Sequence, residues 1–122
     1  MSVFDTSAVL AILNDEDGRA VAESRLRGGS ISLVNVAEVA GDYVLNGRSV
    51  PDGHEALSRL ELAVHAPDAA QALRVAELRS VKNLALGDRF CIALGEALGE
   101  PLVTADQQWA SLSLAVPVEL IR

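Results

Sequence analysis

Cysteine, aromatic residues and long apolar runs are scarce in this chain of 122 residues. Its single cysteine, Cys91, excludes an intramolecular disulfide and a cysteine-based zinc site, and a lone thiol fits the reducing cytosol. Aromatic residues make up 3% of the sequence, so a base-stacking platform for single-stranded RNA is not expected as the main recognition device. No apolar run approaches the ~18–20 residues of a membrane span, and the first residues lack the pattern of a secretion signal. We therefore expect a soluble cytoplasmic protein that does not contact a membrane.

Positive charge is also scarce. The sequence has 10 Lys and Arg residues against 17 Asp and Glu residues, for a formal net charge of −7. This balance disfavours generic electrostatic attachment to nucleic acid or to an anionic membrane. Any nucleic-acid partner would need a specific site rather than a basic surface.

Hydrophobic residues make up 50% of the sequence, and the length fits one domain over residues 1–122. Short apolar runs alternate with longer segments of helical period, which predicts an α/β fold with a short parallel sheet of about four to five strands sandwiched between helices. The expected strands are Ser2–Phe4, Ser30–Val34, Leu62–His65, Leu102–Thr104 and Val116–Leu120. The expected helices are Thr6–Leu13, Gly18–Leu26, Val36–Leu45, Asp52–Leu60, Asp68–Val81, Asp88–Leu98 and Asp106–Leu112.

Four acidic residues fall where chemistry is expected. Asp5 and Asp106 each follow a predicted strand at the opening of a helix, and Glu38 lies one turn into the helix after the second strand. Asp88 opens the helix before the strand that leads to Asp106. Ligands of an open parallel sheet gather outside the carboxyl ends of the strands, so we expect these four side chains to converge in one crevice.

Taken singly, these acids have ordinary explanations. Asp5, Asp88 and Asp106 fit helix caps, and Asn35 with Glu38 has the spacing of a capping box. Together they pose an electrostatic problem, because each close pair of carboxylates repels by roughly 4 kcal/mol at intermediate dielectric. A divalent cation removes that conflict, and oxygen-only ligands suit Mg²⁺ or Mn²⁺ rather than zinc. One or two such ions serve metal-dependent hydrolysis of phosphodiester bonds.

The sequence resembles the PIN domain, and in particular the VapC-type ribonuclease toxins of bacterial toxin–antitoxin pairs. The resemblance spans the whole chain and rests on four segments in order: Val3-Phe4-Asp5-Thr6-Ser7-Ala8-Val9-Leu10, Asn35-Val36-Ala37-Glu38-Val39, Leu86-Gly87-Asp88-Arg89, and Pro101-Leu102-Val103-Thr104-Ala105-Asp106 with Trp109 following.

This resemblance implies a site and partners. The catalytic and metal-binding quartet of the family transfers onto Asp5, Glu38, Asp88 and Asp106, with Thr104 and Thr6 as supporting hydroxyls. It implies an endoribonuclease that depends on Mg²⁺, for which Mn²⁺ can substitute, and that cleaves structured RNA such as tRNA or rRNA. It also implies a homodimer and a toxin–antitoxin hetero-oligomer with a VapB-like antitoxin.

Other polar residues carry weaker hypotheses. Arg89 adjoins Asp88 and is a candidate for binding a substrate phosphate, although a surface or ion-pair role is more usual for an arginine in a first helical turn. The arginines between Arg19 and Arg27, with Arg48, could contact an RNA backbone but fit solvated helix faces better. Cys91 and Trp109 fit packing positions.

Three alternatives compete with a nuclease. The motif of a haloacid-dehalogenase-type phosphatase requires a second Asp two positions after the first, where this chain has Ser7. A receiver domain requires a lysine at the end of its last strand, whereas the only lysine of this chain, Lys82, lies elsewhere. The third alternative is a catalytically silent PIN-like module that binds RNA or a protein partner.

Overall fold

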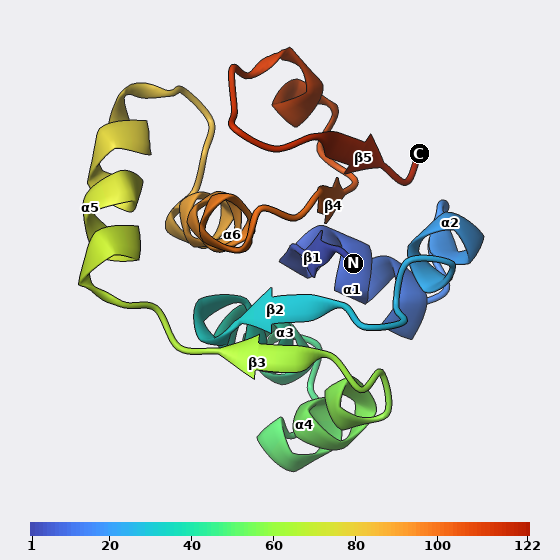
Figure 1. Cartoon of the computed structure of the whole chain (residues 1–122). Helices are drawn as coiled ribbons and strands as arrows, with labels where there is room; N and C mark the ends of the chain where they lie inside the picture. The colour runs from blue at the N-terminus through green and yellow to red at the C-terminus, as the bar shows by residue number, and fades with distance from the viewer.

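A five-stranded sheet organises the chain in the computed structural model, which describes residues 1–122 (Figure 1). The strands are β1 (Val3–Phe4), β2 (Ser30–Ser32), β3 (Ala63–His65), β4 (Leu102–Thr104) and β5 (Val118–Leu120). The α-helices are α1 (Thr6–Leu13), α2 (Arg19–Glu23), α3 (Leu33–Leu45), α4 (Val50–Ser58), α5 (Ala69–Glu77) and α6 (Leu86–Leu98). Two 3-10 helices, η1 (Leu78–Ser80) and η2 (Gln107–Ser111), complete the elements.

All neighbouring strands are parallel, in the order β3-β2-β1-β4-β5. The carboxyl ends of the strands therefore lie along one edge of the sheet. Residues that directly follow β1 and β4 are neighbours at this edge because these two strands pair with each other, with Phe4 opposite Val103. The predicted α/β fold, with its short parallel sheet between helices, is confirmed.

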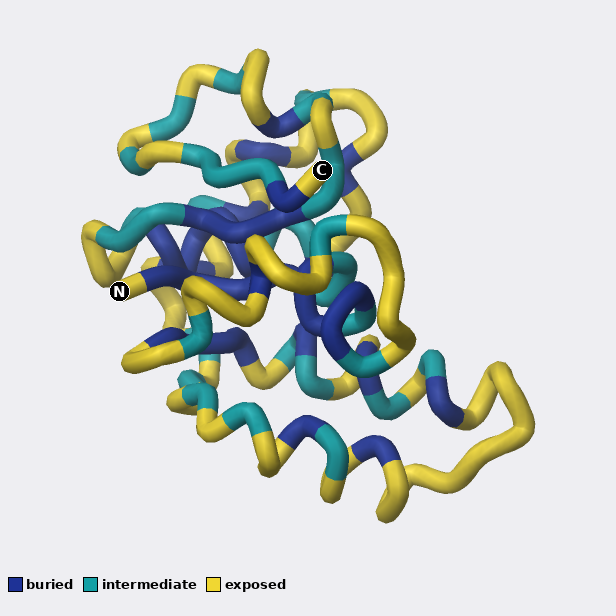
Figure 2. Tube along the Cα trace, turned by 90° about the vertical axis from the view of Figure 1, so that its right-hand side faces the viewer, coloured by how far each residue is buried: buried dark blue, intermediate teal, exposed yellow.

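Two apolar clusters hold the layers together, one on each face of the sheet. Phe4, Ile31 and Val103 turn toward α1, α3 and α4, where Ala8, Val9 and Val39 pack against them. Val3 and Leu102 turn to the other face and pack against α6 and Trp109. Alternation along each strand thus supplies both cores. Figure 2 shows buried residues concentrated along the central strands and on the helix faces turned toward them.

The differences from the sequence prediction concern element ends. The second strand ends at Ser32, and α3 begins at Leu33 because the Ser32 hydroxyl caps the helix by accepting from Val34 N. The segment predicted as one helix over Asp68–Val81 is α5 followed by η1. The helix predicted over Asp106–Leu112 is the 3-10 helix η2, and α6 begins two residues before Asp88. The longest helices have 13 residues, and none is both long and apolar enough to span a bilayer.

Candidate active site

Asp5 is the most constrained acid at the carboxyl edge of the sheet. Only 3% of it is exposed, and it directly follows β1 and caps α1. Its Oδ1 accepts hydrogen bonds from Ala8 N at 2.9 Å and from the Ser7 hydroxyl at 2.7 Å. Its Oδ2 accepts from the Thr104 hydroxyl at 2.6 Å. Both carboxylate oxygens are therefore fixed by short-range partners.

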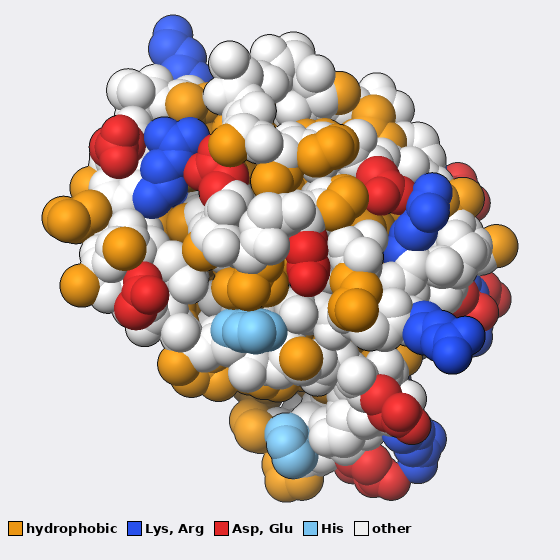
Figure 3. Space-filling model, in the orientation of Figure 1, with side chains coloured by type: hydrophobic (Ala, Val, Ile, Leu, Met, Phe, Trp, Pro, Cys, Tyr) orange, Lys and Arg blue, Asp and Glu red, His pale blue; other side chains and the backbone are white.

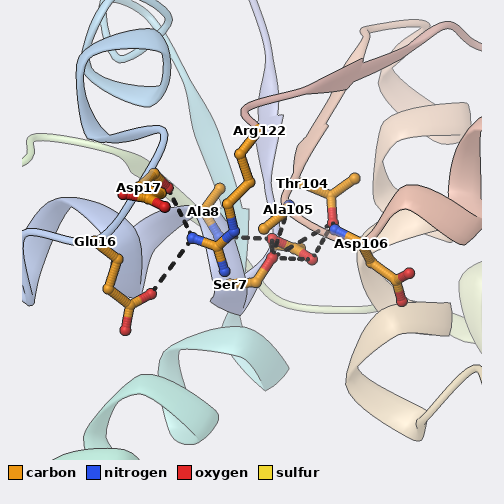
Figure 4. A network of polar contacts seen from close by, with 9 residues as sticks. Ser7, Ala8, Glu16, Asp17, Thr104, Ala105, Asp106 and Arg122 are labelled. Atoms are coloured by element: carbon orange, nitrogen blue, oxygen red, sulfur yellow. Dashed lines mark hydrogen bonds and ion pairs between the residues drawn. The ribbon is translucent and has the colours of Figure 1, made fainter.

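Thr104 joins Asp5 to Asp106. Thr104 is fully buried at the end of β4, and its hydroxyl both donates to Asp5 and accepts from Asp106 N at 3.0 Å. Ser7 closes the same network, since its hydroxyl accepts from Ala105 N at 3.0 Å. Figure 4 shows Ser7, Thr104 and Ala105 gathered together, with the Asp106 carboxyl group turned away from them. Asp106 Oδ1 accepts from Gln108 N, so this acid also caps η2.

Glu38 is held from two sides on α3. Its Oε1 accepts from the Thr6 hydroxyl at 2.5 Å and from Asn35 Nδ2 at 2.9 Å. Asn35 is only 1% exposed, and its amide also donates to Gly87 O at 3.1 Å, which ties α3 to the first turn of α6. The capping box considered for Asn35 and Glu38 is wrong, because Ser32 is the cap and Asn35 lies inside the helix.

Gly87 provides the space that Glu38 occupies. A Cβ at position 87 would lie 2.2 Å from both carboxylate oxygens of Glu38, which is too close for a non-bonded contact. Glycine is therefore needed here for close approach rather than for an unusual backbone angle. Any side chain at this position would displace the Glu38 carboxylate.

Asp88 lies at the third helical position of α6. Its Oδ2 accepts from Ala85 N at 2.8 Å, so it satisfies an orphan amide of the helix start, as the sequence suggested. Burial raises its pKa, and repulsion by Glu38 and Asp106 raises it further. The Ala85 hydrogen bond and the charge of Arg89 act in the opposite direction.

The electrostatics link all four acids. Burial raises the pKa of Asp5 to about 6, against the lowering effect of its bonds from Thr104, Ala8 and Ser7, and the charge of Asp88 adds to the rise. No Lys, Arg or His nitrogen lies within 4.0 Å of any of the four carboxylates, since every ion pair of the molecule involves other acids. None of the four carboxylates thus has an ion-pair partner in the chain, and Arg89 offsets only part of the charge at Asp88.

The negative charge of the acids also affects the Cys91 thiol, which lies inside α6. Its thiol is fully buried, and burial raises its pKa well above the ordinary value, with the charges of Asp5, Asp88 and Glu38 acting in the same direction. The thiol therefore stays neutral, and Cys91 behaves as a small core residue, in keeping with the expectation from its sequence position.

The donor set fits a hard divalent cation in its chemistry. It consists of carboxylate and hydroxyl oxygens, and two of its acids have pKa values raised by burial and mutual repulsion, which a bound cation would relieve. As placed, however, no three His, Cys, Asp or Glu side chains form a group that could hold one ion. Glu38 is turned to Thr6 and Asn35, and Asp106 to η2, so binding requires rotation of these side chains.

Comparison with known proteins identifies the family of this fold. The family model of the PIN domain matches residues 2–113. The chain belongs to the PIN domain family. No curated protein sequence matches it significantly.

Solved structures share the PIN fold over nearly the whole chain. A toxin–antitoxin complex from Klebsiella pneumoniae matches with a TM-score of 0.74 and 22% identity, covering 100% of this chain and 98% of that one. FitAcB from Neisseria gonorrhoeae matches with a TM-score of 0.72 and 24% identity, covering 99% and 98%. VapBC-5 from Mycobacterium tuberculosis, of the VapBC family of toxin–antitoxin systems, matches with a TM-score of 0.61 and 25% identity, covering 99% and 97%.

Within this PIN domain, three residues were not assigned a role in the site from the sequence. Ser7, Asn35 and Gly87 position Asp5 and Glu38 without being acids themselves. Each lies within three residues of one of the four acids, in a segment that carries the family resemblance, and these were the signals that could have identified them. The contacts that reveal them join residues 52 and 98 positions apart.

Arg89 lies beside the site but is partly committed elsewhere. Its Nη1 donates to Val75 O at 3.3 Å, which links α6 to the last turn of α5. The hypothesis that other arginines contact an RNA backbone is weakened. Arg19 and Arg25 form ion pairs, and Arg48 lies over the Tyr43 ring at 3.9 Å.

Proposed function

We propose that this chain is a divalent-metal-dependent endoribonuclease and the toxin of a VapBC-like type II toxin–antitoxin pair. One observation carries the proposal: four carboxylates without an ion-pair partner lie at the carboxyl edge of the sheet in a PIN domain, two of them with raised pKa values. A nuclease of this class uses Mg²⁺, or Mn²⁺ in its place. Its substrate is structured RNA such as tRNA or rRNA.

The four acids have distinct roles in this proposal. Asp5 is the fixed ligand, because Thr104, Ser7 and Ala8 prevent its carboxylate from turning. Asp88, Glu38 and Asp106 would complete the metal site from separate elements, after Glu38 and Asp106 turn from their present hydrogen-bond partners. Thr6 and Thr104 orient carboxylates rather than react, since both hydroxyls donate to acids.

When bound, a divalent ion supplies positive charge that activates water and stabilises the charge developing on the phosphate. Asp5, Glu38, Asp88 and Asp106 would hold that charge in place, and no cationic side chain forms an ion pair with them. Arg89 is proposed to bind a substrate phosphate through Nη2, because Nη1 donates to Val75 O and Nε is buried.

The proposal for the partners is supported by the family and by the complexes that share this fold. VapBC and other toxin–antitoxin complexes share this fold, and the VapBC complexes from Rickettsia felis and Salmonella typhimurium are bound to DNA. We propose a VapB-like antitoxin for this chain, together with a homodimer and a toxin–antitoxin hetero-oligomer.

Cleavage of total RNA by the purified protein tests the proposal. We expect cleavage with Mg²⁺ or Mn²⁺ and none with a chelator. Asp88→Asn should lower the rate at least ~100-fold, as loss of an electrostatic contributor does in other enzymes. Asp52→Asn is the matched control, because Asp52 occupies the same third position of α4 on an exposed surface and should leave cleavage unchanged.

The result that would overturn the proposal is equally clear. Cleavage that survives both Asp88→Asn and Asp5→Asn in the presence of Mg²⁺ would place the activity elsewhere. A protein that binds an antitoxin tightly but cleaves no RNA would favour the catalytically silent module instead.

A further inference from the structure

Half of the basic side chains of this molecule are paired with carboxylates. Of the 10 Lys and Arg side chains, five lie in ion pairs with carboxylates: Arg19, Arg25, Arg59, Arg74 and Arg122. On the face of the molecule shown in Figure 3, most basic side chains lie beside acidic ones. Arg48 is occupied by its contact with the Tyr43 ring. Four cations then have no ionic or aromatic partner: Arg27, Arg79, Lys82 and Arg89.

Three of these four free cations lie close together in the chain. Arg79 is in η1, Lys82 follows it, and Arg89 is in the first turns of α6. From Leu78 to Gly95 the sequence contains a single acid, Asp88. An acidic molecule thus concentrates its unpaired positive charge in one short segment that ends at the candidate site.

This segment is fixed beside the acids rather than loose. Leu78 and Leu84 are 4% and 8% exposed and pack in the cluster that contains Trp109. Gln108 Nε2 donates to Lys82 O at 2.6 Å, which fastens the segment to η2 two residues beyond Asp106. At its other end Ala85 N donates to Asp88. Arg79 and Lys82 themselves are exposed.

We propose that Arg79 and Lys82 form, together with Arg89, a cationic rim that binds phosphates of the nucleic-acid strand on either side of the bond at the acidic site. The inference rests on the proposed function and deepens it by naming where the strand approaches. Lys and Arg contacts to phosphates position a strand without reading its sequence. The rim also resolves the conflict between the net charge of −7 and a polyanionic substrate.

Binding of a bulk tRNA mixture tests the rim. The parent is the Asp5→Asn protein, which retains the rim while cleavage is blocked. Adding Arg79→Gln and Lys82→Gln should weaken binding roughly 10- to 30-fold at ~0.1 M salt. It should also reduce the slope of log affinity against log salt by about 1.4, at about 0.7 for each lost phosphate contact with a single strand.

Arg27→Gln is the matched control. Arg27 is also exposed and without an ion pair, but it precedes β2 and therefore lies at the amino edge of the sheet, away from the acids. It should change binding less than about twofold, as only the net charge differs. In the active protein, the double substitution should raise KM and leave kcat nearly unchanged, the signature of lost uniform binding.

Two results would overturn the rim. The double variant could bind tRNA with the affinity and salt slope of the Arg27→Gln variant, or the parent could fail to bind tRNA at all. Failure of the proposed function is read separately, from absence of RNA cleavage by the unsubstituted protein. Unchanged melting temperatures of the variants confirm that the fold is retained.

Discussion

Single residues of this site serve structure and chemistry at once. Asp5 is a helix cap, as ordinary sequence rules predict, and it is also the buried acid with a pKa of about 6. The two roles are compatible because a cap uses one carboxylate lone pair and leaves the charge in place. A helix cap and a functional site were competing interpretations of Asp5 in the sequence, and in the structure this cap lies within the candidate site.

The raised pKa of Asp5 predicts a stability gain on removing its charge. The pKa rises from an ordinary 3.8 to about 6, so ionisation destabilises the folded state, by up to about 3 kcal/mol. This cost is absent below pH ~4, where both states are protonated, and complete above pH ~6. Asn can keep the Ala8 hydrogen bond, and the Thr104 and Ser7 hydroxyls can rotate to accept from its amide.

Asp5→Asn should therefore raise the free energy of unfolding of the metal-free protein at pH 8 and abolish cleavage. Urea unfolding at pH 4 and pH 8 checks this, with a stabilisation that is present only at the higher pH. Equal effects at both pH values would contradict the burial argument for this carboxyl.

Gly87 allows a test of geometry without loss of charge. Ala at position 87 favours the helix by roughly 0.5–1 kcal/mol, yet its Cβ must push the flexible Glu38 carboxylate aside. We expect Gly87→Ala to fold stably and to lose most cleavage. Gly41→Ala in α3 is the control, since no atom lies within 4 Å of the added Cβ and activity should persist. Full activity of the Gly87→Ala protein would show that the position of Glu38 is unimportant.

Secondary-structure elements were predictable in order and type, and less so at their ends. Short apolar runs identified all five strands. Burial on both faces explains this signal for β1, β2 and β4, whereas β3 is an edge strand that is largely exposed and β5 is half-buried. The 3-10 form of η2 was not evident, since its five residues depend on the packing of Trp109 rather than on periodicity. Likewise Ser32 could not be recognised as the cap of α3, because it also ends a strand with good β pattern.

The junction of β1 and β4 is the element pair that builds the site, and Thr104 is its link. Thr104→Val preserves the strand but removes the hydroxyl that donates to Asp5 and accepts from Asp106 N. The cost should be about 1–3 kcal/mol of stability. Because that hydrogen bond lowers the pKa of Asp5, its loss should shift the acidic limb of the pH–rate profile upward. Thr104→Ser keeps the hydroxyl and should restore the profile; an unshifted limb in the valine variant would contradict this role.

Across the whole molecule, parallel topology explains why acids up to 101 positions apart, Asp5 and Asp106, lie near each other. The convergence at one edge could be predicted from strand order of an α/β fold. The directions in which the side chains turn could not, since they follow from contacts such as Asn35 with Gly87.

Thermal unfolding with increasing Mg²⁺ or Mn²⁺ tests most directly whether these acids share a cation. Ligand that binds only the folded state at about tenfold its Kd stabilises by about 1.4 kcal/mol, which is roughly 4–6 °C for a domain of this size. We predict such a rise for the unsubstituted protein and for Asp52→Asn, and its loss in Asp88→Asn. A melting temperature indifferent to millimolar Mg²⁺ and Mn²⁺ in all three proteins would contradict a metal site formed by Asp5, Glu38, Asp88 and Asp106.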